Sequence, residues 1–146
     1  MTAGPRSVRP VHPALGVLAV SLGGAVGATV RWGLTAAAPV ATGHFPWVTF
    51  LINVVGSALL AAVPLLSAVR RHAWVGLALG TGVLGGFTTM SSASVETFVL
   101  LDRNQVGLAA AYCLGTLGAA LLAVLAVDRF TTPAERDGAE RAGWDE

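Results

Sequence analysis

The sequence predicts an all-α membrane protein with four transmembrane helices. Its composition indicates a membrane protein, because 54% of its 146 residues are hydrophobic and only 12% are charged. The apolar residues fall into four runs, each at least as long as the roughly 20 residues that a helix needs to cross the hydrocarbon core. We therefore expect a multi-pass protein of the cell membrane, in contact with lipid, whose four-helix domain covers residues 14–127. The expected spans are 14–38, 47–69, 73–101 and 106–127.

The first expected span combines a glycine face with one charge. Gly23, Gly24 and Gly27 are small residues that allow helices to pack closely. Arg31 lies near the end of the span and is followed by Trp32, a residue typical of the membrane interface. Its side chain either snorkels to the headgroups or faces a water-filled vestibule, where it attracts anions.

Asn53 is the notable residue of the second expected span. Thr49 lies one turn before it and Ser57 one turn after it, so the three residues share one helical face. An amide at this depth must be hydrogen-bonded. Its partner is either a neighbouring helix or a solute that passes through the protein.

The third expected span contains a polar stretch, from Gly85 to Glu96, that predicts a break near the middle of the helix. Paired glycines lower helix propensity and mark places where helices kink or open. Carbonyl groups freed in hydrocarbon must find a new partner or coordinate something. The stretch therefore predicts either a functional site or a packing face of small residues. Glu96, towards the end of the span, is costly there unless it meets water, a donor or a proton.

Tyr112 and Thr116 lie one turn apart on one face of the fourth expected span. Tyr112 is too deep to be an ordinary interfacial tyrosine, so its hydroxyl needs a hydrogen-bond partner.

The basic residues predict the orientation of the chain. All nine are arginines. One side of the expected topology collects Arg6, Arg9, Arg70, Arg71 and Arg129, with Arg136 and Arg141 further along. The other side holds Arg103, plus Arg31 if its side chain snorkels. By the positive-inside rule, we expect a cytoplasmic N-terminal segment, 1–13, and a disordered cytoplasmic tail, 128–146.

The motifs that would indicate an enzyme or a nucleic-acid-binding protein are missing from the sequence. It has no catalytic motif, no basic stripe and one cysteine, so we expect neither catalysis nor nucleic-acid binding. Most of its buried polar groups are hydrogen-bond donors, which suit an anion that sheds part of its hydration. Four helices form a poor conduit, and we therefore expect oligomerisation through the glycine-rich faces.

Three ordered motifs resemble the Fluc (CrcB-type) fluoride channels. Gly23-Gly-Ala-Val-Gly-Ala-Thr-Val-Arg31-Trp32 is similar to that family's Gly-Gly-x-x-Gly-Ala-x-x-Arg-Tyr opening. Phe50-Leu-Ile-Asn53-Val-Val-Gly56-Ser57 is similar to its Thr-Leu-x-Val-Asn-x-x-Gly-Ser segment. The stretch from Gly85 to Glu96 resembles its Gly-Gly-x-Thr-Thr-Phe-Ser-Thr-Phe-Ser-x-Glu signature.

The resemblance implies passive export of cytoplasmic fluoride through two pores of an antiparallel, dual-topology dimer. It implies that Arg31 lies in a vestibule, and that backbone carbonyls of Gly85 and Thr88 from both subunits hold a structural sodium ion. The residues that it implies along the fluoride path are Asn53, Thr89, Ser91, Ser92, Glu96, Tyr112 and Thr116.

Two departures from the family pattern suggest a heterodimer. Met90 and Ala93 occupy positions where the family has phenylalanines, whose ring edges meet fluoride. The arginine bias is also strong for a chain that inserts in both orientations. We therefore hypothesise that this chain pairs with an oppositely oriented homologue. The alternative is a homodimer of this chain with a degenerate pore.

The residues are compatible with two other hypotheses about the function. In a small proton-coupled exporter, Glu96 would be the proton-exchanging carboxylate. In a structural membrane subunit, the glycines and hydroxyls would serve packing alone.

Overall fold

The structure, a computed structural model, describes residues 11–130. Within them every regular element is a helix, and four helices are long and apolar enough to cross a membrane: Pro13–Ala37, Trp47–Leu65, Ala73–Asp102 and Val106–Phe130. The elements are α1 (Pro13–Ala37), α2 (Trp47–Ala62), η1 (Val63–Leu65), α3 (Ala73–Gly76), η2 (Leu77–Leu84), α4 (Gly85–Phe87), α5 (Met90–Asp102) and α6 (Val106–Phe130). The prediction of an all-α protein with four spans is confirmed, and the chain is a multi-pass membrane protein.

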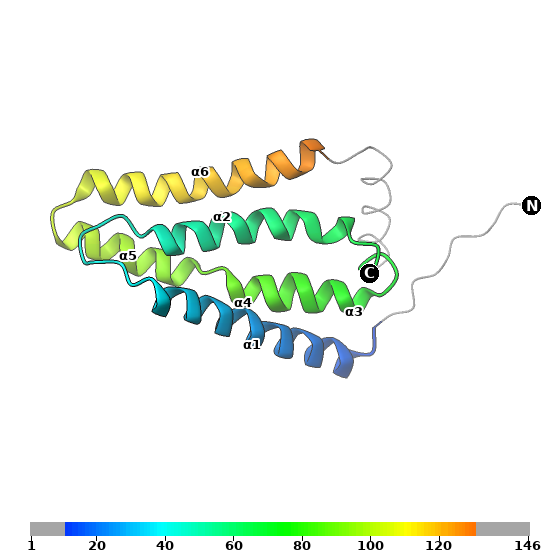
Figure 1. Ribbon diagram of the computed structural model, residues 1–146. Coiled ribbons are helices and arrows are strands. Elements are labelled where there is room, and N and C mark those ends of the chain that lie inside the picture. The colour runs from blue at the N-terminus through cyan, green and yellow to red at the C-terminus, as the bar shows by residue number, and fades with distance from the viewer. Residues whose placement is uncertain (1–10, 131–146) are drawn as a thin grey trace, which may run out of the picture.

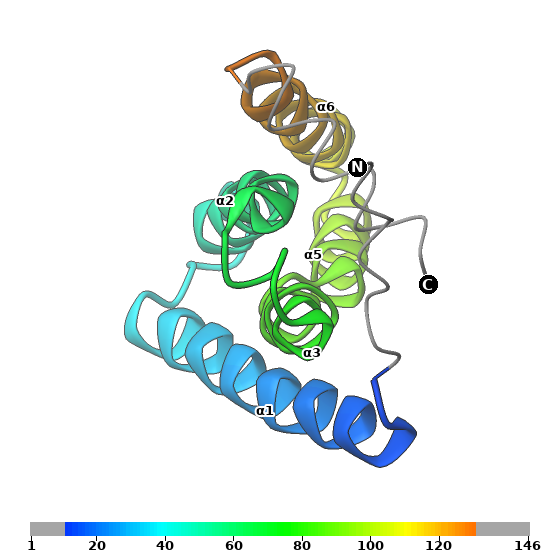
Figure 2. The ribbon, with the colours of Figure 1, turned by 90° about the vertical axis from the view of Figure 1, so that its right-hand side faces the viewer.

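The helices run side by side as a bundle (Figure 1). The start of α1, the end of α6 and the connection from α2 to α3 lie at one end of the bundle. The loop from α1 to α2 and the turn from α5 to α6 lie at the other end, here called the α1–α2 loop end. Seen end-on, α2, α5 and α6 group together, while α1 covers the side formed by α3, η2 and α4 (Figure 2).

A seam of glycines joins α1 to the third span. A Cβ atom added to Gly23 or Gly27 would overlap backbone atoms of η2, and one added to Gly86 would overlap the backbone of α1. The helices approach this closely because neither backbone carries a side chain at the seam. Gly23 and Gly27 of α1 therefore pack inside the subunit. Oligomerisation through other glycine-rich faces stays a prediction, since a Cβ atom added to Gly115 or Gly118 of α6 would meet no neighbouring atom within 4 Å.

The second span ends earlier than expected. Helix α2 stops at Ala62, one turn of 3₁₀ helix follows at Val63–Leu65, and the chain then turns. Pro64 lies in that turn, and it has no N–H to continue an α-helical ladder. The predicted boundary at residue 69 is therefore too late.

The third span is broken near its middle, as predicted, but not at the paired glycines. Gly85 and Gly86 are helical in α4, and the chain becomes extended at Thr88 (φ −74°, ψ 156°) and Thr89 (φ −151°, ψ 115°). The glycines stay helical where α4 packs against α1. Before the break, η2 forms a π-helix of eight residues, an element that is rare and frequent at functional sites.

The last helix extends beyond its predicted end. Asp128, Arg129 and Phe130 belong to α6 rather than to a disordered tail, and Arg129 in the last turn complements the helix dipole. The remainder of the expected tail, 131–146, and most of the expected N-terminal segment, 1–10, lie outside the described residues.

The core lies between α5 and α6. Ala93, Leu100, Ala109 and Tyr112 form a buried cluster, against which Phe45, Phe50 and Leu108 pack. The outward faces of the helices remain apolar, as on Val17, Phe98 and Leu122, which are 68%, 67% and 67% exposed. Apolar outer faces are expected of helices that contact lipid.

Candidate functional site

Asn53 of α2 bonds both backbone polar groups of Thr89 at the break. Its Oδ1 accepts from the Thr89 N–H at 2.8 Å, and its Nδ2 donates to the Thr89 carbonyl at 3.0 Å. The Thr89 N–H would otherwise bond the Gly85 carbonyl, four residues back. The Asn53 amide thus replaces the helical ladder and fixes the break against α2.

Thr89 is also the N-cap of α5. Its Oγ1 accepts from the Ser92 N–H at 3.1 Å, the usual action of a threonine N-cap. The same hydroxyl lies 3.0 Å from Ser92 Oγ and 3.2 Å from Ser91 Oγ. Three hydroxyls therefore form one small cluster directly after the break.

Glu96 accepts hydrogen bonds from two other helices. Thr49 of α2 donates to Oε1 at 2.7 Å, and Tyr112 of α6 donates to Oε2 at 2.5 Å. Thr49 is 1% exposed and Tyr112 is 0% exposed, so both hydroxyls are held away from solvent. The sequence-based requirements that Glu96 meet a donor and that Tyr112 find a partner are both satisfied by this contact.

These groups form a polar strip, defined as Thr49, Asn53, Thr89, Ser91, Ser92, Glu96 and Tyr112. Helical spacing explains the strip, because Thr49 and Asn53 are four residues apart on α2, as are Ser92 and Glu96 on α5. The strip runs from the break towards the α1–α2 loop end. Its chemistry is that of hydroxyl and amide groups that exchange hydrogen bonds around one carboxylate.

Thr116 lies one turn beyond Tyr112 and is 8% exposed. Its hydroxyl donates to the Tyr112 carbonyl at 2.6 Å, so the hydrogen points along its own helix. Among the hydroxyls predicted along a path, Thr116 is therefore the one committed to its own backbone.

Arg31 turns inward. Its Nε donates to the Gly86 carbonyl at 3.1 Å, which ties α1 to α4 just before the break. Trp32, the next residue, is 69% exposed and faces outward. The bond to the third span favours the vestibule alternative for Arg31 over snorkelling, and the vestibule role stays a prediction.

The Thr88 carbonyl at the break remains without a donor. The amide N–H groups that would reach the Thr88 carbonyl in a continuous helix belong to α5, where the Ser92 N–H bonds Thr89 Oγ1 instead. No hydrogen bond to the Thr88 carbonyl is formed by residues 11–130. Nor do the described residues bring three acidic, histidine or cysteine side chains together as a metal site.

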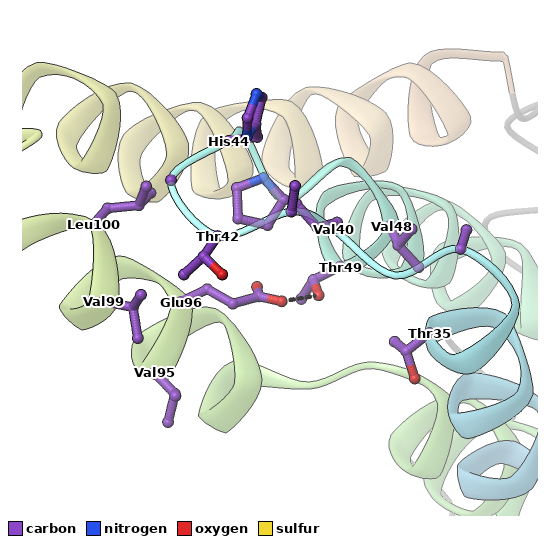
Figure 3. Close-up of a pocket in the computed structure, with 14 residues that line it drawn as sticks. Thr35, Val40, Thr42, His44, Val48, Thr49, Val95, Glu96, Val99 and Leu100 are labelled. Carbon is purple, nitrogen blue, oxygen red and sulfur yellow. Dashed lines mark hydrogen bonds between the residues drawn. The ribbon is translucent and has the colours of Figure 1, made fainter. Parts of the chain in front are cut away.

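A pocket of about 230 Å³ opens at the α1–α2 loop end (Figure 3). Glu96 and Thr49 lie in its wall, so the pocket meets the polar strip. The loop contributes Val40 and Thr42, and α1 contributes Thr35. The strip therefore leads from the break to an opening in the surface.

Met90 and Ala93 face different surroundings. Met90 is 74% exposed on the outer face of α5, whereas Ala93 is 8% exposed and belongs to the core cluster with Tyr112. A phenylalanine at position 90 would thus project from the subunit, and one at position 93 would enter its core.

A family model described as "CrcB-like protein, Camphor Resistance (CrcB)" matches residues 18–127. The match reaches all four spanning helices and contains the whole polar strip. The chain belongs to the CrcB family.

Curated relatives of this CrcB-family chain include three proteins with similar names. It is 40% identical over 126 residues to "Fluoride-specific ion channel FluC 2" of Nocardia farcinica, covering 83% of this chain and 87% of the relative. It is 42% identical over 113 residues to "Fluoride-specific ion channel FluC 2" of Nitrobacter hamburgensis, covering 75% and 90%. It is 40% identical over 119 residues to "Fluoride-specific ion channel FluC" of Agrobacterium fabrum, covering 77% and 92%.

Sequence reasoning left two groups of this CrcB-family chain out of the site. The sequence places Thr49 on the Asn53 face of its helix but does not predict its bond to Glu96, which makes it part of the strip. Thr35 and Thr42 carry no motif, and they reach the pocket because the α1–α2 loop folds over α5. Their only sequence signal is that Thr35 lies near the end of α1 and Thr42 lies in the loop itself.

Proposed function

We propose that the chain is a subunit of a channel through which cytoplasmic fluoride leaves the cell down its own gradient. Family membership and the printed names of the relatives support the proposal, since each of the three is named a fluoride-specific ion channel. The observation that carries it is the polar strip, which crosses from the break to the pocket within apolar helices.

The strip supplies donors to a small anion one at a time. The Ser92 hydroxyl accepts from Thr89, so its own hydrogen is available to an anion. Asn53 uses one of its two Nδ2 hydrogens on Thr89, which leaves the second. Further along, Thr49 and Tyr112 lend their hydrogens to Glu96, and fluoride would compete with the carboxylate for them. Competition of this kind lets an anion bind without being trapped.

A second subunit completes the path in our proposal. Ser91, Met90 and Gly85 are all exposed around the break, so one subunit leaves this polar segment uncovered. A buried route for fluoride needs another protein surface there, because lipid offers no donors. The antiparallel arrangement implied by the resemblance would bring a second break against this one.

We also propose that carbonyls at the break hold a structural sodium ion between the subunits. The undonated Thr88 carbonyl and the Gly85 carbonyl, whose usual Thr89 donor bonds Asn53, fit the oxygen ligands that hard cations prefer. Bound there, the ion would hold together the backbone carbonyls at the breaks of the two subunits. The Gly86 carbonyl is less suited, since Arg31 already bonds it.

The partner is proposed to be a homologous chain of opposite orientation. This subunit has Met90 and Ala93 where the family has phenylalanines, so it lacks the aromatic ring edges expected at those two positions. The arginine bias favours one orientation, with both termini in the cytoplasm. Several relatives carry the numbers 1 and 2 in their names, as expected where one organism has two such chains.

Growth in fluoride tests the function. A bacterial strain without its own fluoride exporter should regain growth in fluoride when this chain is produced together with a CrcB-family chain whose arginine bias favours the opposite orientation. The Tyr112→Phe variant should restore growth poorly, whereas Thr97→Val is the control, because its hydroxyl bonds Ala93 and lies off the strip. The proposal would be contradicted if the strain stayed equally sensitive to fluoride whichever CrcB-family chain was produced together with this one.

A further inference from the structure

We infer that the pocket at the α1–α2 loop end is a binding site for a small organic cation that carries N–H groups, such as a primary ammonium. The inference rests on the proposed function only where it concerns fluoride flow. The pocket itself is defined by 14 residues from α1, the α1–α2 loop, α2 and α5. Its volume, about 230 Å³, lies just below the roughly 300–1,000 Å³ of sites for drug-sized ligands, which suits a small ion.

The charge in the pocket is negative. Glu96 is the one carboxylate among the lining residues, and neither arginine nor lysine is among them. His44 is the other titratable residue of the wall, and Figure 3 shows its ring pointing away from Glu96. A cation is attracted to this carboxylate, whereas fluoride would pass it only by taking the Thr49 and Tyr112 hydrogens, as proposed above.

The polar groups of the pocket are mostly acceptors. Each threonine hydroxyl has a single hydrogen. Thr49 gives its hydrogen to Glu96, and Thr35 gives its hydrogen to the Arg31 and Trp32 carbonyls at 3.1 and 2.9 Å. Neither hydroxyl therefore has a hydrogen left to donate to a ligand in the pocket. Thr42, which forms no side-chain hydrogen bond within residues 11–130, turns its hydroxyl into the space between the loop and Glu96 (Figure 3).

Glu96 retains capacity for a ligand. A carboxylate offers about four lone-pair sites, of which Thr49 and Tyr112 occupy two. An ammonium has three hydrogen-bond donors and no acceptor. It therefore complements a pocket wall whose polar side chains have unused acceptor positions. Val95, Val99 and Leu100 form the apolar part of the wall, which reduces solvent screening of the charge pair and receives an alkyl group.

Occupancy of the pocket would affect the strip. A bound cation would engage the same carboxylate that holds the Thr49 and Tyr112 hydrogens and would fill the opening to which the strip leads. We therefore expect such a cation to slow fluoride efflux.

Calorimetric titration of the purified full chain tests the site without reference to flux. Methylammonium chloride should bind saturably. Tetramethylammonium chloride, with the same charge but no N–H, should bind about tenfold more weakly, the value of one charge-assisted hydrogen bond. Glu96→Gln should abolish methylammonium binding. Equal affinity for both ions, or no saturable binding of methylammonium, would overturn the inference.

Threonine variants provide the matched control. Thr35→Val removes an acceptor from the pocket while keeping the side-chain shape, and should weaken methylammonium binding several-fold. Thr29→Val lies on the same helix outside the pocket, where its hydroxyl bonds the Ala25 carbonyl, and should bind as the parent chain does. Equal effects of the two variants would contradict the placement of the site, even where Glu96→Gln fails to fold.

A flux arm separates this inference from the proposed function. In liposomes that contain this chain together with a CrcB-family chain of opposite arginine bias, methylammonium should slow the release of fluoride, and tetramethylammonium at the same concentration should not. Saturable binding without slower release would overturn the link to the fluoride route. Liposomes that release no fluoride would contradict the proposed function, and the titration would still decide the cation site.

Discussion

Asn53 holds Thr89 by both of its backbone polar groups, with distances of 2.8 and 3.0 Å. The two residues are 36 positions apart in sequence, and they meet because α2 packs beside the broken third span. A break inside a membrane leaves backbone groups that need partners, and one side-chain amide supplies two of them here. The position of the break thus depends on a residue of another helix.

Replacing Asn53 by alanine should destabilise the protein. The variant leaves the N–H and the carbonyl of Thr89, a residue 8% exposed, without their partners. Each unsatisfied group costs about 1–3 kcal/mol. The loss should appear as a lower midpoint of thermal unfolding in detergent, followed by circular dichroism. Ser57→Ala, one turn away on α2, is the control and should unfold as the parent does.

Thr49 and Tyr112 should act as a coupled pair in fluoride efflux. Each single variant, Thr49→Val or Tyr112→Phe, removes one of the two hydroxyls that Glu96 holds, and should reduce efflux about tenfold. Because both bond one carboxylate, the double variant should differ from the product of the single effects. Strictly multiplicative effects would argue that the two hydroxyls serve fluoride independently.

The glycine seam predicts opposite outcomes for two substitutions on α1. Gly27→Ala places a Cβ against the Val83 carbonyl and should cost about 1–3 kcal/mol through overpacking. Gly33→Ala meets no atom within 4 Å and should be neutral or stabilising, since alanine has the higher helix propensity. Thermal unfolding of both variants checks this, and a tolerated Gly27→Ala would contradict the close approach of α1 and η2.

The two positions that lack phenylalanine should respond differently to its introduction. Met90→Phe adds a ring on a surface that is 74% exposed and should leave the stability of the subunit unchanged. Ala93→Phe inserts a ring among Leu100, Ala109 and Tyr112, where overpacking costs about 1–3 kcal/mol. The comparison is made by thermal unfolding of each variant. Equal stability of the two would show that the space beside Ala93 is larger than the structure indicates.

The sequence predicted the spans and the polar residues because both depend on local patterns. Hydrophobic length defined the four helices, and the depth of Tyr112 and Glu96 showed that each needed a partner. That they bond one another depends on α5 and α6 being neighbours, which periodicity does not reveal.

Other features were missed because tertiary contacts override local preference. The paired glycines predicted the break two or three residues too early, since α1 keeps them helical while Asn53 and the N-cap at Thr89 open the chain beyond them. The inward turn of Arg31 likewise requires a carbonyl of α4 within reach. The π-helix of η2 has no signal in the sequence that we recognise.

The central claim, that the polar strip conducts fluoride, is tested most directly by ion-selective electrode recordings of efflux from liposomes. The liposomes would contain this chain together with an oppositely biased CrcB-family chain and would be loaded with both fluoride and chloride. We expect rapid release of fluoride, retention of chloride, and fluoride release about tenfold slower with Tyr112→Phe in this chain. Release of chloride as fast as fluoride, or fluoride release indifferent to Tyr112→Phe, would contradict the account.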